Sequence, residues 1–129
     1  MQVYYFTRTG RSKKVAEELA ERYETKAQEI ADDVNWQGAM GYLKAGYEAF
    51  KKETRPARYN KPTADEELIL VFPVWAGTFP PAVRTFLERE GRAKVICMPT
   101  SIGSKLNDRE GFIKVIDLVG KTITTPESI

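Results

Sequence analysis

The chain has 129 residues, which is enough for one domain with a buried core. Hydrophobic residues make up 42% and charged residues 29%, as in ordinary globular domains, and no apolar run reaches the roughly 18 residues of a membrane-spanning helix. The net charge is +2, and the basic residues are interspersed with acidic ones rather than gathered in a patch. We therefore expect a single domain over residues 1–129, with neither nucleic acid nor a membrane as a partner.

Histidine and cysteine usage narrows the chemistry further. There is no histidine, which excludes Ser-His and Cys-His nucleophilic catalysis and removes the commonest metal ligand. The one cysteine, Cys97, lies in an apolar run, which indicates a buried and inert thiol. The absence of a disulfide framework and of a signal peptide favours the cytoplasm. We expect no metal and no catalytic side chain, so that any chemistry belongs to a bound cofactor.

The first elements are a strand and an amphipathic helix. Residues 2–6 form a short apolar run that is typical of a buried strand. From about 12 to 25, Val15, Leu19 and Tyr23 fall four residues apart, which predicts one apolar helix face. A second, weaker strand is predicted at 26–30.

A second helix is predicted at 38–52, inside what would otherwise be an improbably long loop. Met40, Leu43, Tyr47 and Phe50 stand at helical spacing in this segment. We expect Tyr47, and Tyr42 with it, to lie in the core rather than at a ligand.

The second half of the chain continues the alternation of strands and helices. The remaining predictions are strands at 67–72, 94–98 and 113–119 and helices at 80–90 and 105–110. This order predicts an α/β fold with a parallel sheet, right-handed crossovers and helices on both faces. Only residues 121–129 follow the last strand, where a further helix is expected. We therefore expect either a homodimer or a tail that folds back over the uncovered face.

The turn after the first strand has the chemistry of a phosphate site. It reads Thr7-Arg8-Thr9-Gly10-Arg11-Ser12 and opens directly into the first helix. The N–H groups of a helix start have no intrahelical acceptor and carry the positive end of the dipole, and the hydroxyl groups add further donors. Gly10 allows a sharp turn and a close approach to a ligand. The side chains of the two arginines are not required for such a site, so we expect them to face solvent or a partner.

Two further loops follow the carboxyl ends of the third and fourth strands, where ligands bind in parallel sheets. The loop that begins with Pro73 and Val74 places Trp75 among residues too small to shield it, so that its ring can stack on a flat ligand. The small polar loop at 100–104 can offer backbone groups to the edge of a heterocycle. A phosphate site beside a flat, polar-edged ring site predicts a mononucleotide.

These stretches resemble the flavodoxins. Residues 5–16 resemble the FMN-phosphate loop of that family, residues 72–78 resemble its flavin loop, and residues 41–47 resemble one flavodoxin-like subgroup. The resemblance covers residues 1 to about 104 and implies FMN and a flavodoxin-like, doubly wound, five-stranded sheet of order 2-1-3-4-5 without the usual C-terminal helix. The chain departs from the family in its two loop arginines and in an isoelectric point near 8.6, since flavodoxins are typically acidic.

Carried over by position, the resemblance implies that the hydroxyl-rich loop binds the FMN phosphate and that the other two loops border the flavin ring, with a backbone contact from Ala76-Gly77 to flavin N5. The implied cofactor-binding residues are Thr7, Arg8, Thr9, Gly10, Arg11, Ser12, Pro73, Val74, Trp75, Ala76, Gly77, Thr100, Ser101, Ile102 and Gly103. The implied function is electron transfer between redox partner proteins, a reductase donor and an acceptor. The alternative is an FMN-dependent NAD(P)H:quinone-type oxidoreductase.

Each motif can also serve the fold alone. The hydroxyl-rich turn can be a plain helix N-cap, Trp75 a packing residue, and residues 100–104 a simple strand-to-helix turn. The chain lacks the signature residues of other families that share this order of elements or bind nucleotides. A phospho-receiver domain needs acidic residues where Phe6, Thr7 and Pro73 stand, and a low-molecular-weight phosphatase needs a cysteine in the first loop. No G-x-G-x-x-G follows any strand, and the glycine that would precede a nucleotide-triphosphate motif at 120–122 is replaced by Val115.

Overall fold

A computed structural model describes all residues, 1–129. The strands are β1 (Gln2–Tyr5), β2 (Ala27–Glu29), β3 (Leu68–Pro73), β4 (Val95–Ser101), β5 (Lys114–Val115) and β6 (Leu118–Val119). The helices are α1 (Arg11–Arg22), α2 (Gly38–Phe50) and α3 (Pro81–Glu90).

All pairings between these strands are parallel, and the order across the sheet is β2-β1-β3-β4-β5, with β6 also paired to β4. β5 and β6 are two short pieces of the single fifth strand predicted at 113–119, and they are separated by Ile116 and Asp117. The predicted α/β class and the order 2-1-3-4-5 are confirmed.

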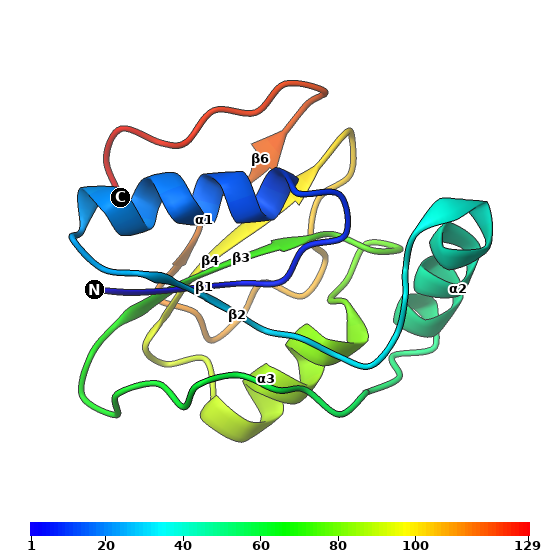
Figure 1. The fold of residues 1–129 in the computed structure, drawn as a ribbon, viewed down its shortest axis with the longest axis horizontal. Helices are drawn as coiled ribbons and strands as arrows, with labels where there is room; N and C mark the ends of the chain where they lie inside the picture. Colours follow the sequence, from blue (N-terminus) through cyan, green and yellow to red (C-terminus); the bar gives the residue numbers. More distant parts are fainter.

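The sheet is covered by α1 on one face and by α3 on the other (Figure 1). The sequence of β3 is a continuous apolar run because successive side chains of a strand point to opposite faces of the sheet and both faces are buried here. Ile69 and Val71 join the core on the α1 side, whereas Leu68, Leu70 and Phe72 join the core on the α3 side.

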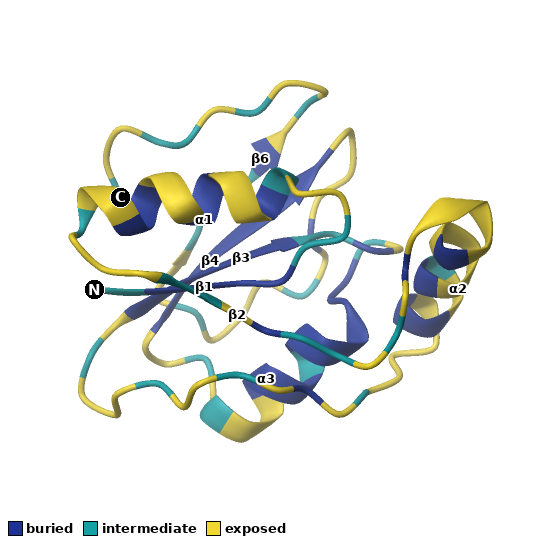
Figure 2. Cartoon of the chain, viewed as in Figure 1, coloured by how far each residue is buried: buried dark blue, intermediate teal, exposed yellow.

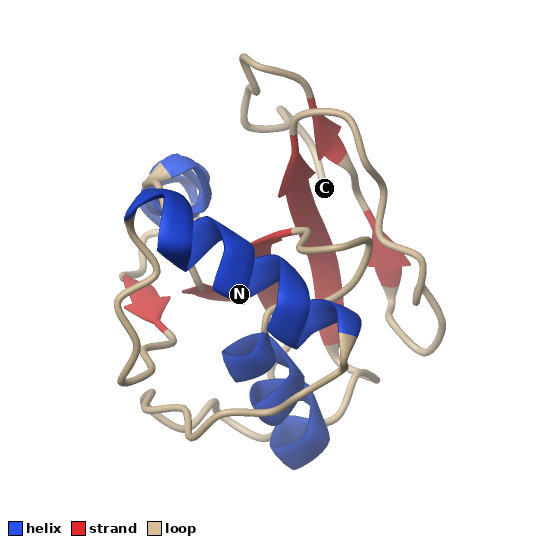
Figure 3. Cartoon of the chain, turned by 90° about the vertical axis from the view of Figure 1, so that its right-hand side faces the viewer, coloured by secondary structure: helices blue, strands red, loops and turns tan.

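α2 lies beyond the carboxyl ends of the strands instead of on a face of the sheet, as Figures 1 and 3 show. It buries Gly41, Ala45 and Ala49 toward the domain, and its outer side is exposed (Figure 2). The prediction that Tyr42 and Tyr47 lie in the core was therefore wrong. The reason is a close approach to the preceding segment, because a Cβ atom at Gly41 would lie 2.3 Å from the Trp36 carbonyl group. Small side chains therefore occupy most of the inner side of a helix placed so near, and Glu48 is the exception.

Two further predictions, one helix and one strand end, were wrong. The segment 105–110 forms no helix, and it is held instead by contacts such as the hydrogen bond from the Asn107 N–H to the Gly77 carbonyl (2.8 Å). β4 does not end at Met98 but continues to Ser101, because it pairs with β3 up to Thr100 and with β6 up to Ser101. The first two residues of the predicted loop 100–104 thus belong to the strand.

The C-terminal tail folds back over α1 (Figure 1). Ile123 and Ile129 pack against the core on the α1 side, and the Arg22 guanidinium donates to the backbone carbonyl groups of Pro126 and Glu127. Of the two alternatives predicted from the missing last helix, the structure shows the folded-back tail.

Candidate functional site

The first turn of α1 presents backbone N–H groups that have no partner within the chain. α1 begins at Arg11, and its first helical hydrogen bond runs from the Lys14 N–H to the Gly10 carbonyl (3.0 Å). The N–H groups of residues 11–13 precede that bond and therefore have no helical acceptor. Together with the positive end of the helix dipole they form an environment that favours an anion.

The turn before α1 depends on a glycine and a threonine. Gly10 has a φ of +97°, and its N–H donates to Thr7 Oγ1 at 2.9 Å. A Cβ atom at position 10 would meet no other atom within 4 Å, so glycine is required for its backbone conformation and not for space. The Thr7 hydroxyl thus shapes the loop, and Thr9 lies beside it at the same cavity.

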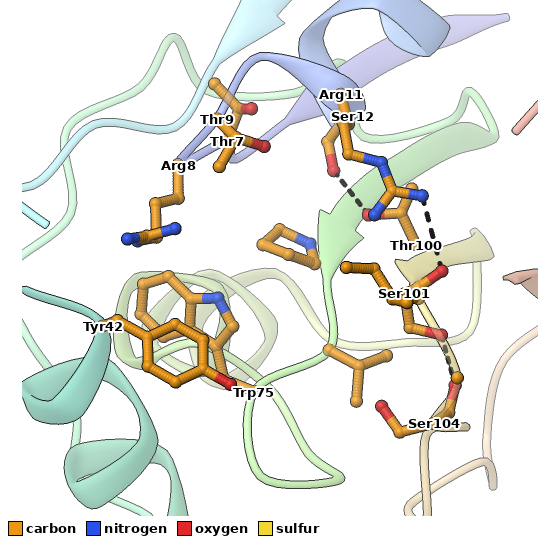
Figure 4. A pocket seen from close by; sticks show the side chains of 14 residues that line it. Thr7, Arg8, Thr9, Arg11, Ser12, Tyr42, Trp75, Thr100, Ser101 and Ser104 are labelled. Carbon is orange, nitrogen blue, oxygen red and sulfur yellow. Dashed lines mark hydrogen bonds between the residues drawn. The ribbon is translucent and has the colours of Figure 1, made fainter. Parts of the chain in front are cut away.

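A buried hydroxyl pair joins α1 to the end of β4. Ser12 Oγ and Thr100 Oγ1 lie 2.9 Å apart, and both side chains are buried (Figure 4). Thr100 Oγ1 also lies 3.4 Å from the Phe72 carbonyl, to which it can donate. Residues predicted for the phosphate end and for the ring end of the ligand are therefore in direct contact.

Trp75 is shielded, contrary to the prediction from its small sequence neighbours. Only 8% of it is exposed, because Phe6 and Trp36 pack against it edge to face with ring centroids 5.5 Å and 5.0 Å away. Trp36 was not predicted as part of this region. Its signal in the sequence is a lone tryptophan between two polar residues just before a predicted helix, which can serve as a packing anchor.

The loop that carries Trp75 is a tight hairpin turn. The N–H and carbonyl groups of Trp75 and Thr78 bond to each other at 3.0 Å, with Ala76 and Gly77 between them at φ values of +50° and +77°. Two positive φ values are what a type I′ turn requires. The Gly77 carbonyl already accepts a hydrogen bond from Asn107, so this turn is fixed from outside.

The side chains of Arg8 and Arg11 are half-buried and bond to backbone carbonyl groups of the chain itself, whereas the prediction had them facing solvent or a partner. Arg8 Nε donates to the Trp36 carbonyl at 2.8 Å and Nη2 to the Gly38 carbonyl at 3.2 Å, which ties the loop to the start of α2. Arg11 Nη2 donates to the carbonyl groups of Ser101 and Gly120, which ties α1 to the ends of β4 and β6. Both arginines therefore connect the loop to backbone groups of distant segments.

The sequence prediction also missed Tyr42 as a residue of this region. It projects from α2 toward the cavity and is 67% exposed, and the Arg8 guanidinium carbon lies 5.5 Å from its ring centroid (Figure 4). A tyrosine at this position of the helix could have been identified only by knowing where α2 lies.

The three loops surround one cavity of about 340 Å³, a volume within the range of small-molecule sites (Figure 4). Twelve of the fifteen predicted residues line it, and Tyr42 and Ser104 complete the wall. The predicted residues that do not line it are Gly10, Ala76 and Gly77. The cavity-lining residues are Thr7, Arg8, Thr9, Arg11, Ser12, Tyr42, Pro73, Val74, Trp75, Thr100, Ser101, Ile102, Gly103 and Ser104.

The charges of the cavity are of one sign. Its wall contains two arginines and no aspartate or glutamate. Cys97 is buried away from the cavity, and burial raises the pKa of its thiol to about 12, so it is not a nucleophile. No three His, Cys, Asp or Glu side chains gather where they could hold a metal ion, and none of the helices has the length and apolarity to cross a membrane.

The parallel sheet with a cavity at the carboxyl ends of its strands defines a doubly wound α/β architecture, in which ligands bind at this edge. The sequence model of the flavodoxin family matches residues 1–117, and the chain belongs to that family. Among curated protein sequences, none matches significantly.

Solved structures show the same fold. A flavoprotein from Lactobacillus acidophilus, determined in complex with FMN, is 18% identical with a TM-score of 0.71, over 92% of this chain and 91% of that protein. A protein assigned as a flavoprotein from Bacteroides uniformis is 24% identical with a TM-score of 0.73, over 94% and 90%. Another from Bacteroides eggerthii is 23% identical with a TM-score of 0.67, over 80% and 71%.

Proposed function

We propose that the cavity binds FMN, with the phosphate at the start of α1. The observation that carries this proposal is the set of N–H groups at residues 11–13, which have no acceptor in the chain and lie beside the hydroxyl groups of Thr7 and Thr9. Hydrogen bonds from such donors to a charged phosphate are stronger than those to a neutral group. The family to which the chain belongs and the FMN bound to the Lactobacillus flavoprotein support the same cofactor.

The composition of the wall fits both ends of FMN. Around the start of α1, two arginines and no carboxylate suit a dianionic phosphate. At the end of β3, the half-buried Pro73 and Val74 provide an apolar surface for a flat ring, beside the mostly shielded Trp75. Ser101, at the end of the neighbouring strand β4, and Gly103, in the loop after it, line the same cavity, where their backbone groups can face the polar edge of that ring.

We infer that the protein carries electrons between redox partner proteins. Bound FMN supplies one- and two-electron chemistry, which no side chain of this cavity provides. The residues of the chain bind and orient the cofactor. The cavity wall contains no histidine, cysteine or carboxylate that could act as a general base or nucleophile, which favours a carrier.

One observation favours the second candidate, an FMN-dependent reductase of quinones. A second cavity of about 360 Å³ lies between α2 and the Trp75 loop, and it shares Tyr42, Val74 and Trp75 with the first. Its other residues are Ala45, Gly46 and Ala76. An apolar cavity beside a flavin site suits a flat acceptor such as a quinone.

The binding experiment is a titration of the apoprotein with FMN, followed by flavin fluorescence. FMN fluorescence should be quenched, and riboflavin, which lacks the phosphate, should bind at least about 100-fold more weakly because the charge-assisted hydrogen bonds are lost. Gly10→Val should weaken FMN binding by at least about 10-fold with little change for riboflavin, since φ at this position disfavours a β-branched residue. Unchanged FMN fluorescence would contradict the proposed cofactor.

Steady-state kinetics of the FMN-loaded protein distinguish an electron carrier from a quinone reductase. A carrier should be reduced by a reductase protein but should oxidise NAD(P)H with a quinone only slowly. Rapid NAD(P)H oxidation that depends on the quinone would instead support the reductase. In that case Gly46→Leu, at a lining position where an added Cβ meets no atom within 4 Å, should narrow the second cavity and raise the KM for the quinone without changing FMN binding.

A further inference from the structure

α2 turns its large apolar side chains away from the rest of the domain. Met40, Leu43, Tyr47 and Phe50 are 79%, 63%, 60% and 72% exposed. The opposite side of the same helix is buried, as the two colours of α2 in Figure 2 show. A helix normally places its apolar stripe against the core, so the arrangement is the reverse of the usual one.

These four residues, which we call the α2 seam, form a regular stripe. They are spaced by three, four and three residues, which aligns them on one side of a helix over about 15 Å. The same spacing is that of the a and d positions of a heptad, whose side chains pack against a second helix. The spacing therefore favours a helix as the surface that covers the seam.

The exposed area is large for a monomer. With about 200 Å² for each fully exposed side chain of this size, the four exposed fractions correspond to about 550 Å². Patches of this size lie at the upper end of what monomeric proteins expose. Two such seams facing each other, with their flanking residues, reach the roughly 1,200 Å² at which stable interfaces begin.

We propose that a second copy of this chain docks on the α2 seam, with the two helices antiparallel about a two-fold axis. In this arrangement Met40 meets Phe50 of the second copy, and Leu43 meets its Tyr47. Each aromatic ring then faces a flexible or smaller aliphatic side chain, so the seam is complementary to itself. The docked helix also carries Tyr42, which lines the candidate FMN cavity, so the dimer holds one wall of the site in place.

The two edges of the seam differ. Ala39 and Gly46 border it on one side and allow the backbones to approach closely. Lys44 and Lys51 border it on the other side, where Lys44 lies 3.8 Å from Glu48 Oε2. In the antiparallel pair the two lysine edges face each other, and salt screens their repulsion. The dimer should therefore become tighter as salt is added, whereas an acidic partner protein on this face would be released.

The oligomeric state of the 129-residue chain tests the proposal without FMN, so its outcome does not depend on the proposed function. Sedimentation at about 100 μM should show a dimer that strengthens with salt. Leu43→Glu/Tyr47→Glu should weaken the dimer at least 100-fold. The control Ile113→Glu, which adds a charge at an exposed apolar residue away from α2, should leave it unchanged. A monomeric wild-type chain, or a dimer that the double variant does not weaken, would overturn the proposal.

A cross-linking variant gives a second test that does not require a charged residue on the helix. Leu43→Cys/Tyr47→Cys should form a disulfide-linked dimer under mild oxidation, because the antiparallel arrangement places each of these positions opposite the other. Cys97 is buried and does not compete. The matched variant Glu17→Cys/Glu21→Cys places two exposed cysteines at the same spacing on α1, away from the seam, and should remain uncross-linked. Equal cross-linking of both variants would contradict the antiparallel seam.

Discussion

α1 and α2 are amphipathic helices of 12 and 13 residues, and they place their apolar residues in opposite directions. In α1, Val15 and Leu19 are buried against the sheet. In α2, the large residues of the seam face outward, and only small residues and Glu48 face the domain. Apolar periodicity thus predicts that a helix has a stripe, but it does not predict which surface will cover that stripe.

The difference between the two helices follows from the space that the sheet offers. α1 connects the adjacent parallel strands β1 and β2, so it must cross a sheet face, and that face is free to receive it. On the opposite face, beside α3, the irregular segment after α2 already occupies the surface. Its Tyr59 ring lies 6.4 Å from the Tyr4 ring and 4.7 Å from the Phe86 ring. α2 is therefore displaced beyond the ends of the strands (Figure 1).

The largest expected difference in stability is between truncating a large apolar side chain in α1 and truncating one in α2. Leu19→Ala should lower the free energy of unfolding by about 2–5 kcal/mol, because Leu19 is fully buried against the sheet. Leu43→Ala should change it by less than about 0.5 kcal/mol at concentrations where the chain is monomeric, since the side chain is mostly exposed. Urea unfolding at low protein concentration measures both values. Equal losses of stability in the two variants would mean that the large residues of α2 pack against the domain.

The next test concerns the small inner side of α2. Gly41→Ala should lower the free energy of unfolding by about 1–3 kcal/mol, because the added Cβ would overlap the Trp36 backbone at 2.3 Å. Gly46→Ala, on the same helix, would meet no atom within 4 Å. It should raise the stability by about 0.5–1 kcal/mol through helix propensity. Thermal unfolding followed by circular dichroism compares the two, and a harmless Gly41→Ala would refute the close approach of α2 to Trp36.

The smallest effect is expected from the ion pair beneath α2. Glu48 is buried and accepts hydrogen bonds from Arg55 Nε at 2.7 Å and Nη2 at 2.8 Å. Glu48→Gln should lower the free energy of unfolding by about 1–2 kcal/mol, since a charged hydrogen bond is lost while part of the Arg55 side chain stays in solvent. The control is Lys44→Gln, which removes only the exposed and longer contact to Glu48 and should cost less than about 0.5 kcal/mol. Urea unfolding at neutral pH measures both, and similar losses would show that the inner carboxylate does not anchor the helix.

Much of the candidate site was predictable because its residues follow strand ends. The anion-binding character of a hydroxyl-rich glycine turn before a helix depends only on residues that are adjacent in the sequence. The carboxyl ends of the strands in a parallel sheet lie at one edge, so loops that follow different strands come together there. The shielding of Trp75 was not predictable in this way, since it depends on Phe6 and Trp36, which come from other parts of the chain. Tyr42 was missed for the same reason, because the position of α2 brings it to the cavity.

The sequence by itself determined the approximate positions of the strands, the parallel α/β sheet, the edge at which the site lies and the glycine turn before α1. Each of these follows from interactions within a few residues or from the need to bury apolar runs. The tertiary structure alone decided the direction in which α2 faces and the partners of the two loop arginines. Arg8 bonds to a carbonyl 28 residues away and Arg11 to one 109 residues away. Such contacts depend on which backbone groups the fold brings within reach of each side chain, and that is a property of the assembled chain.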